Sequence, residues 1–330
     1  MHLITTARLR RRGWISTNFE LFSFAHHNYK GVFMKVAFIG TGSMGGSMSR
    51  NLASAGVDIT VFDLNTESMK KPVAAGAKAA SSAVECVTDA DFLITMLPTP
   101  QAIEACMIAG GVAAALKPGS MWIDMSTSIP ETANLVAKHL QSGVRVVDAP
   151  VAGMSVGADK GTMSIFCGAT ESEIAEAKPL FDIMGDPEKF FHCGKQGTGY
   201  AVKLVLNMLW FDYYMASVEA LMLGVKAGVD LETLRLALVG SPANSTIMER
   251  DIIPLLRDGD YDEGFAVALA CKDIRLANDL ARSVGVPLEV SSTVEQLYRR
   301  ARARYGDTAG ECIPAKLYED DTNTLLRYKK

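Results

Sequence analysis

The sequence predicts a doubly wound α/β domain followed by an all-helical domain. Between Met34 and Gly194, short apolar runs alternate with helical stretches, which is typical of a parallel sheet with crossover helices. Beyond Gly194 the strand pattern stops and only helical patterns follow. The chain has 330 residues, 48% of them hydrophobic, so it is long enough to form two cores. We expect residues 34–194 to form the first domain and residues 195–330 the second.

Residues 1–33 differ in composition from the rest of the chain. They are basic, with one acid, Glu20, against Arg8, Arg10, Arg11, Arg12 and Lys30. Two interpretations stay open: a transit peptide for an organelle, or an extension that reflects the choice of start site. We prefer the second, because Met34 directly precedes the first buried strand, and we expect a non-structural extension.

Six apolar runs predict the strands of the first domain. They are Lys35–Gly40, Ile59–Asp63, Phe92–Leu97, Met121–Met125, Val144–Val151 and Thr162–Cys167. The helices expected between them are Met44–Ala55, Glu67–Ala75, Pro100–Ile108, Pro130–Gln141 and Glu171–Ile183. Because the strands are almost continuously apolar, we expect helices on both faces of the sheet.

The second domain is predicted to begin with an unusually long helix. The expected helices are Tyr200–Ala227, Leu231–Val239, Ile247–Leu256, Phe265–Ser283 and Val290–Tyr305. The first contains Lys203, Asp212, Glu219 and Lys226. Ionised groups at a bilayer centre cost about 2.5–3.5 kcal/mol each, so we expect a helix buried within protein and no membrane partner.

The charge and the cysteines exclude several classes of function. The net charge is -4, from 33 basic and 37 acidic residues, which leaves no surplus to neutralise a nucleic acid. The 6 cysteines form no CxxC pair, so no metal site is expected. We interpret them as reduced thiols in a cytoplasmic protein.

A glycine-rich turn, Gly40-Thr41-Gly42-Ser43-Met44-Gly45, lies between the first strand and the first helix. In this GxGxxG pattern the first glycine permits a tight turn, the second admits a pyrophosphate and the third lets the helix pack on the strand. Asp63 follows at about the ~20-residue distance where an acid binds the adenosine ribose. Because no arginine follows it to hold a 2'-phosphate, we expect a Rossmann site for NAD in preference to NADP. The alternative for Asp63 is a solvated turn residue.

Other candidate ligand residues lie where further strands end, since ligands bind at the carboxyl edge of such a sheet. The segment Met96-Leu97-Pro98 is apolar enough to cover a ribose or nicotinamide, and Thr127 offers a hydroxyl near it. Asp148, two residues before Pro150, we interpret as a structural turn former.

Lys203 and Asn207 are four residues apart, on one face of the long helix, and follow a flexible glycine-rich segment over residues 194–199. Apolar neighbours would lower the pKa of the lysine, as a general acid/base requires. The alternative is a lysine whose ammonium group reaches water. Lys272 either returns to the cofactor or forms a surface ion pair with Asp273.

Taken together, these motifs resemble the β-hydroxyacid dehydrogenases, the group of 3-hydroxyisobutyrate dehydrogenase and tartronate semialdehyde reductase. The motifs, in order, are Phe38–Gly45, Met96-Leu97-Pro98, Ser126-Thr127, Asp148-Ala149-Pro150-Val151, Gly194–Asn207 and Lys272-Asp273. The resemblance implies that Lys203 is the acid/base, Asn207 its helper on the substrate, and Lys272 a residue near the nicotinamide. The glycine turn, including Ser43 and Met44, with Asp63, Met96, Leu97, Pro98 and Thr127, would line the cofactor.

The resemblance also implies an activity: hydride transfer between NAD and a small hydroxy acid, or its carbonyl form, by a homodimer or homotetramer. Where the family has Ser-Gly-Gly to receive the substrate carboxylate, this chain has Ala152-Gly153-Met154, and Met208 follows Asn207. These departures predict a more apolar pocket. Two alternatives remain, an imine reductase-like enzyme and a non-catalytic dinucleotide-binding module. Retention of Lys203 and Asn207 weighs against both.

Overall fold

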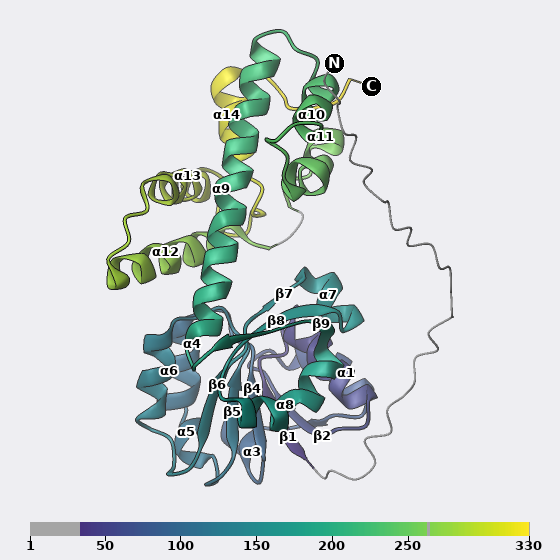
Figure 1. Ribbon diagram of the computed structural model, residues 1–330. Helices are drawn as coiled ribbons and strands as arrows, with labels where there is room; N and C mark the ends of the chain where they lie inside the picture. Colours follow the sequence, from purple (N-terminus) through teal and green to yellow (C-terminus); the bar gives the residue numbers. More distant parts are fainter. Residues whose placement is uncertain (1–33, 263–264, 330) are drawn as a thin grey trace, which may run out of the picture. The chain divides into compact units, whose positions relative to one another are not determined.

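The computed structural model of the chain describes residues 34–262 and 265–329 (Figure 1). The expected extension over residues 1–33 lies outside this range. The described residues contain a sheet with helices packed on it, followed by a series of helices. Helix α9 (Thr198–Lys226) begins beside the sheet, where it packs on three strands, and continues into the helical part, where it packs on four further helices.

The first six strands form a parallel sheet, and all of them except the short third strand, Lys78–Ala79, correspond to runs that the sequence predicts. In the described residues the sheet order is β3-β2-β1-β4-β5-β6-β8-β7, with β9 beside β8. The bounds are β1 Lys35–Ile39, β2 Asp58–Phe62, β3 Lys78–Ala79, β4 Phe92–Thr95, β5 Met121–Asp124, β6 Arg145–Asp148, β7 Val151–Ala152, β8 Met163–Gly168 and β9 Gly185–Gly194. All pairs from β3 to β6 are parallel, and the order 3-2-1-4-5-6 is that of a doubly wound dinucleotide fold, so the predicted fold class is confirmed.

Helices cover both faces of this sheet, as its apolar strands predict. On β1, Val36 and Phe38 belong to one core, and Ala37 and Ile39 to another. On one side α1 packs with α7 and α8, and on the other α4 packs with α6. The helices are α1 Gly45–Ser54, η1 Thr66–Met69, α2 Lys70–Ala74, α3 Ala83–Val87, α4 Pro100–Glu104, η2 Ala105–Ala109, α5 Val112–Ala115, α6 Pro130–Ala137, α7 Met154–Lys160 and α8 Glu171–Met184.

Three predictions for the sheet were wrong in detail. The strand expected over Val144–Val151 is two strands, β6 and β7, because Pro150 between them has no N–H to donate to a ladder. The strand expected over Thr162–Cys167 is β8, but it runs antiparallel to β6 and β7. Strand β9 was not predicted, since the polar run Asp186–Lys189 hides its pattern.

The helical part has its own core, which includes Phe211, Tyr214, Leu255, Ile274 and Tyr298. Its helices after α9 are α10 Leu231–Val239, η3 Ile247–Asp251, α11 Ile253–Asp258, α12 Val267–Val284, α13 Glu289–Tyr305 and α14 Ala315–Thr322. Helix α14 was not predicted. Within the described ranges, no helix combines the length and the apolar character that crossing a membrane requires.

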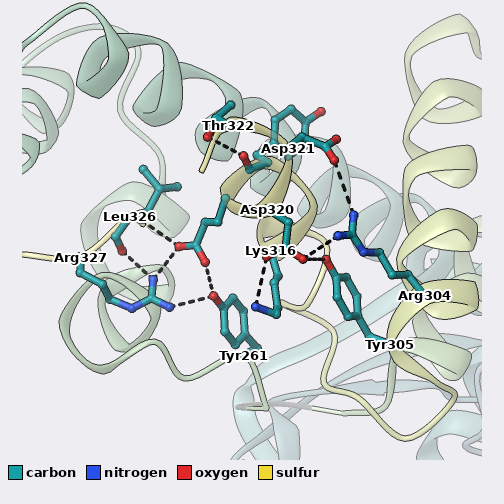
Figure 2. Close-up of polar contacts among 11 residues, drawn as sticks. Tyr261, Arg304, Tyr305, Lys316, Asp320, Asp321, Thr322, Leu326 and Arg327 are labelled. Atoms are coloured by element: carbon teal, nitrogen blue, oxygen red, sulfur yellow. Dashed lines mark hydrogen bonds and ion pairs between the residues drawn. The ribbon is translucent and has the colours of Figure 1, made fainter. Parts of the chain in front are cut away.

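A polar cluster fixes the C-terminal segment to the helical part (Figure 2). The side chain of Glu319, which is fully buried, pairs with Arg327 at 2.7 Å and accepts the N–H of Leu326 at 2.8 Å. Figure 2 shows Tyr261 and Arg327 facing each other, and the guanidinium donates to the Tyr261 hydroxyl at 2.8 Å. Glu319 is therefore a buried carboxylate with its counter-charge directly attached.

Candidate functional site

The glycine turn forms a tight backbone cradle at the end of β1. Gly40 has a φ of +96°, and a Cβ there would lie 2.3 Å from the Met96 carbonyl oxygen. A Cβ on Gly45 would lie 1.9 Å from the Gly40 oxygen, so helix α1 can approach only without a side chain. A Cβ on Gly42 meets nothing within 4 Å, which leaves open space beside the backbone. These three environments fit the roles that the pattern requires for a bound dinucleotide.

Asp63 lies immediately after β2, beside this turn. Its Oδ2 accepts the N–H of Thr41 at 2.7 Å and its Oδ1 accepts the N–H of Asn65 at 2.8 Å. The carboxylate is therefore held against the glycine turn rather than free in solvent, which disfavours the simple turn-residue alternative. Each oxygen retains a lone pair that a ribose hydroxyl could use. Contact with the ribose stays a prediction.

Asp124, a buried carboxylate at the end of β5, connects the end of β4 to α9 through hydrogen bonds. It accepts hydrogen bonds from Thr95 at 2.7 Å, from Ser126 at 2.6 Å and from the Tyr200 hydroxyl at 2.8 Å. The Ser126 oxygen in turn accepts the N–H of Leu97 at 2.8 Å. Burial raises the pKa of Asp124, and these donors act against it. This network was not predicted, because in the sequence Asp124 resembles an ordinary strand residue.

Asp148, at the end of β6, holds the start of α9. Its Oδ1 accepts the N–H of Gly197 at 2.5 Å and its Oδ2 accepts the N–H of Tyr200 at 2.9 Å. A Cβ on Gly199 would lie 2.8 Å from that carboxylate, so the glycine permits the close approach. Burial raises the pKa of Asp148 to about 6. These contacts agree with the structural role predicted for it.

Lys203 lies in the second turn of α9, on its buried side, and is only 9% exposed. Burial lowers its pKa to about 8, while the negative charges of Asp273 and Glu311 oppose the change. Asn207, one turn later, donates its Nδ2 to Asp273 Oδ2 at 2.7 Å. The alternative of an ammonium group extended into water is wrong, since the side chain is buried.

Lys272 on α12 reaches back to the edge of the sheet. Its ammonium group donates to the carbonyl oxygens of Pro98 at 2.9 Å and Thr127 at 3.3 Å. It also pairs with Asp273 at 3.0 Å, and the two side chains are 11% and 3% exposed, so this is no surface ion pair. The structure thus brings Lys203, Asn207 and Lys272 together with the Pro98 and Thr127 segments.

The expected substrate segment, Ala152–Met154, crosses from β7 into α7. Gly153 has a φ of +137°, and Met154 has a φ of +57°, which is unusual for a residue with a side chain. Met154 is 52% exposed. No hydrogen bond in the described part of the chain joins this segment to Lys203 or Lys272, so its role stays a prediction.

One pocket of about 370 Å³ opens along α9, beginning one helical turn after Lys203. It is lined by Leu206, Leu209, Trp210 and Tyr213 from the helix and by the segment 244–247. The helix contributes large apolar side chains, and Asn244, Ser245 and Thr246 contribute polar ones. The sequence analysis did not identify this pocket, since residues 244–247 belong to no motif. Within the described ranges, no three metal-ligating side chains converge.

The chain is similar to known proteins along both its sheet part and its helical part. Residues 35–194 match the family described as the NAD binding domain of 6-phosphogluconate dehydrogenase. Residues 197–318 match the family described as NAD-binding of NADP-dependent 3-hydroxyisobutyrate dehydrogenase. Together with the dinucleotide cradle, these matches define an NAD(P)-dependent dehydrogenase that acts on CH–OH groups, with NAD as its cofactor.

Individual relatives specify the family. The chain is 35% identical to 2-(hydroxymethyl)glutarate dehydrogenase of Eubacterium barkeri over 272 residues, covering 82% of this chain and 90% of that protein. It is 35% identical to the human mitochondrial 3-hydroxyisobutyrate dehydrogenase over 277 residues, covering 82% of each. The solved 3-hydroxyisobutyrate dehydrogenase of Mycobacterium tuberculosis with L-serine has a TM-score of 0.77 at 31% identity, covering 86% of this chain and 99% of that one. The chain belongs to the β-hydroxyacid dehydrogenase family.

Proposed function

We propose that this protein interconverts a small hydroxy acid and its carbonyl form with NAD, and that Lys203 is the general acid/base. The observation that carries the proposal is the burial of Lys203, which lowers its pKa to about 8, one turn from Asn207. A group with a pKa near the working pH can both accept and return a proton. The relatives named as dehydrogenases of 2-(hydroxymethyl)glutarate, 3-hydroxyisobutyrate and L-serine support the substrate class.

In the oxidative direction, neutral Lys203 takes the proton from the substrate hydroxyl. Bound NAD supplies the acceptor for the hydride. In the reductive direction, the Lys203 ammonium gives the proton back to the substrate oxygen. Asn207 is held by Asp273 through one N–H, which leaves its amide oriented to hold the substrate. Lys272 fixes the Pro98 and Thr127 segments at the nicotinamide end.

Several residues are proposed to hold the cofactor and the substrate. Gly40, Gly42 and Gly45, with Ser43 and Met44, would receive the pyrophosphate, Asp63 the adenosine ribose, and Met96, Leu97, Pro98 and Thr127 the nicotinamide half. The backbone of Ala152-Gly153-Met154 would hold the substrate carboxylate without a serine hydroxyl. The pocket beside Leu206 and Trp210 would accommodate an apolar substituent.

We also propose a homodimer or homotetramer, in which α9 contributes to the contact. Val202, Val205 and Leu223 on this helix, outside the pocket, are 36%, 54% and 73% exposed, a large apolar area for a free surface. A cytoplasmic location is proposed from the sequence, in which the six cysteines form no CxxC pair. The division into domains at residues 194–195 rests on the end of β9 at Gly194 and the start of α9 at Thr198.

The alternative of an imine reductase-like enzyme has less support. The imine reductase of Myxococcus stipitatus matches with a TM-score of 0.57 but only 14% identity, a likeness of fold alone. The buried Lys203 is the feature that favours a dehydrogenase of CH–OH groups.

The proposal is tested with Lys203→Ala and a matched control, Lys195→Ala, which removes an exposed lysine from the segment before α9. Loss of a positioned acid/base costs about 100- to 10,000-fold in kcat. We expect that loss for Lys203→Ala on the best hydroxy acid from a screen, with the Kd for NAD nearly unchanged. The control should match the wild type in both. A Lys203→Ala enzyme with wild-type kcat would disprove the role.

A further inference from the structure

The pocket beside α9 lies next to the proposed acid/base on the same helix. Leu206 and Trp210 line it, and they follow Lys203 by three and seven residues, the spacing that places side chains on one face of a helix. With a rise of about 1.5 Å per residue, Leu206 lies about 4.5 Å and Trp210 about 10.5 Å further along the axis. A molecule held at Lys203 and Asn207 therefore has the pocket beside it, toward the C-terminal end of α9.

The described residues that line this pocket are all uncharged. The segment opposite α9, residues 244–247, connects α10 to η3, and both of these helices pack on α9. This segment contributes the neutral polar groups of Asn244, Ser245 and Thr246, and α9 contributes apolar and aromatic side chains. An ionised substituent would lose hydration there without gaining an ion pair. The pocket is therefore suited to a neutral group.

Trp210 is a wall of the pocket, and three neighbours fix its ring. The indole N–H donates to Asp251 Oδ2 at 3.2 Å. Tyr214 stacks on the ring with centroids 5.4 Å apart and planes 3° apart, and Phe211 lies at 88° to it with the same centroid distance. Tyr214 is itself buried, and its hydroxyl donates to the Cys312 carbonyl oxygen at 2.7 Å. The indole is thus a preformed surface, which a ligand does not have to order.

The size of the pocket and its uncovered apolar surface indicate how large the bound group is. Leu209 and Tyr213, which also line it, are 42% and 49% exposed. The volume is about 370 Å³, whereas a cavity of about 150 Å³ is sufficient to bind benzene. A group as large as a phenyl ring therefore fits, and it would remove apolar surface of these side chains from water. A methyl group would leave most of the volume unfilled.

We propose that Trp210 is a specificity-determining residue, and that the pocket selects hydroxy acids with a neutral apolar substituent as large as a phenyl ring, held against the indole. This inference rests on the proposed function, since it places the hydroxyl of the same molecule at Lys203. The substituent takes no part in the chemistry. Its burial along Leu206 and Trp210 stabilises the complex, while Lys203 and Asn207 hold the reacting end.

The first measurement compares kcat/KM with NAD for three acids that differ only in the substituent on C2. They are 3-hydroxyisobutyrate with a methyl group, 2-benzyl-3-hydroxypropanoate with a benzyl group, and 2-(hydroxymethyl)succinate with an ionised carboxymethyl group. Burial of a phenyl ring is worth about ten- to hundred-fold, so we expect the benzyl acid to exceed the other two by that factor. Equal values for the benzyl and methyl acids, or a succinate value as high as the benzyl one, would overturn the proposal.

Variants of the pocket are compared by the ratio of kcat/KM for the benzyl and methyl acids, in which any effect common to both acids cancels. Trp210→Ala should lower the ratio about ten-fold or more by removing the wall, and Trp210→Phe less, because a ring remains. Thr246→Phe should also lower it, since the new ring fills the pocket from an exposed position opposite α9. Wild-type ratios in these variants would overturn the proposal.

The matched control is Thr293→Phe, at an exposed threonine of α13 outside the pocket, which should keep the wild-type ratio. Should Trp210→Ala not fold, the ratio of Thr246→Phe decides. Analytical ultracentrifugation tests whether a second copy of the chain covers the pocket instead. A dissociated oligomer in Trp210→Ala or Thr246→Phe, together with the wild-type ratio, would overturn the proposal and make the pocket a contact between copies.

A binding measurement separates this inference from the proposed function. The NADH-loaded enzyme is titrated calorimetrically with the benzyl and methyl acids, and no turnover occurs because NADH cannot accept a hydride. A tighter Kd for the benzyl acid that Thr246→Phe abolishes supports the inference, even where Lys203→Ala retains activity and the acid/base role is lost. Equal Kd values for the two acids overturn the inference, even where Lys203→Ala is inactive.

Discussion

The glycine turn and the lysine cluster are built in opposite ways. Residues 40–45 are contiguous, and they form the cradle from backbone atoms. Glycine occupies the positions, 40 and 45, where a Cβ would meet neighbouring backbone. Lys203 and Asn207 lie on α9 and Lys272 lies on α12, far away in the sequence, and the charged side chain of Asp273 connects Asn207 to Lys272. The turn is therefore sensitive to added atoms, and the cluster to lost charges.

The largest effect is expected in the cluster, from Asp273→Asn. The change keeps the shape but leaves Lys272 without its ion pair at 3.0 Å. Removing one partner of a buried pair costs about 3–5 kcal/mol of unfolding free energy. On the same helix, Asp279→Asn removes the partner of Arg282 in a pair whose side chains are 47% and 65% exposed. That control should cost less than about 1 kcal/mol. Urea unfolding of both variants measures the difference, and equal losses would contradict it.

In the turn, Gly45→Ala and Gly42→Ala should differ from each other. The new Cβ at residue 45 meets backbone at 1.9 Å, whereas at residue 42 it meets nothing within 4 Å. Overpacking costs about 1–3 kcal/mol, so Gly45→Ala should lose both stability and NAD binding. Gly42→Ala should unfold like the wild type but bind NAD at least about ten-fold more weakly, about 1.4 kcal/mol. Calorimetric titration with NAD checks this, and wild-type affinity in Gly42→Ala would refute the assignment.

Cofactor choice should depend on one charge beside the turn. Asp63→Ser with Asn65→Arg removes the carboxylate that Thr41 holds at 2.7 Å and adds a cation for a 2'-phosphate. Each change is expected to favour NADP by roughly ten-fold at low salt, from about 1–3 kcal/mol per charge-assisted hydrogen bond. The ratio of kcat/KM for NAD and NADP measures it, with Glu67→Ser as a nearby control. A wild type that already prefers NADP would show that Asp63 does not bind the ribose.

The smallest effect is expected for Met154→Gly, which adds no atoms and removes no charge. Met154 has a φ of +57°, where a side chain costs about 1–2 kcal/mol and glycine loses about 0.5–1 kcal/mol in entropy. We therefore expect a gain of about 0.5–1 kcal/mol in unfolding free energy from the difference of these terms. Ser155→Gly, one residue later in α7, should instead lose about 1 kcal/mol. A loss for Met154→Gly would mean that its side chain packs usefully.

The sequence predicted most of the nucleotide-binding half because its signals are local. Alternating apolar runs and one glycine pattern are sufficient for β1, β2 and β4 to β6, but not for the two-residue β3. A four-residue spacing is sufficient to relate Lys203 to Asn207. Strand β9 has no such signal, because its polar residues break the apolar pattern. It is a strand because its backbone pairs with β8. The hydrogen-bond network of Asp124 could not be predicted either, because its partner Tyr200 is remote in the sequence.

The start of α9 has a consequence for motion. Glycines 194, 197 and 199 suggest a flexible joint, yet Asp148 binds the N–H groups of Gly197 and Tyr200, and Asp124 binds the Tyr200 hydroxyl. The joint is thus clamped to two strands of the sheet, three residues before Lys203. Any hinge that opens the site must lie beyond the lysine. The position of the Lys203 amine is then set by the sheet, through Asp148 and Asp124, and not by a loop.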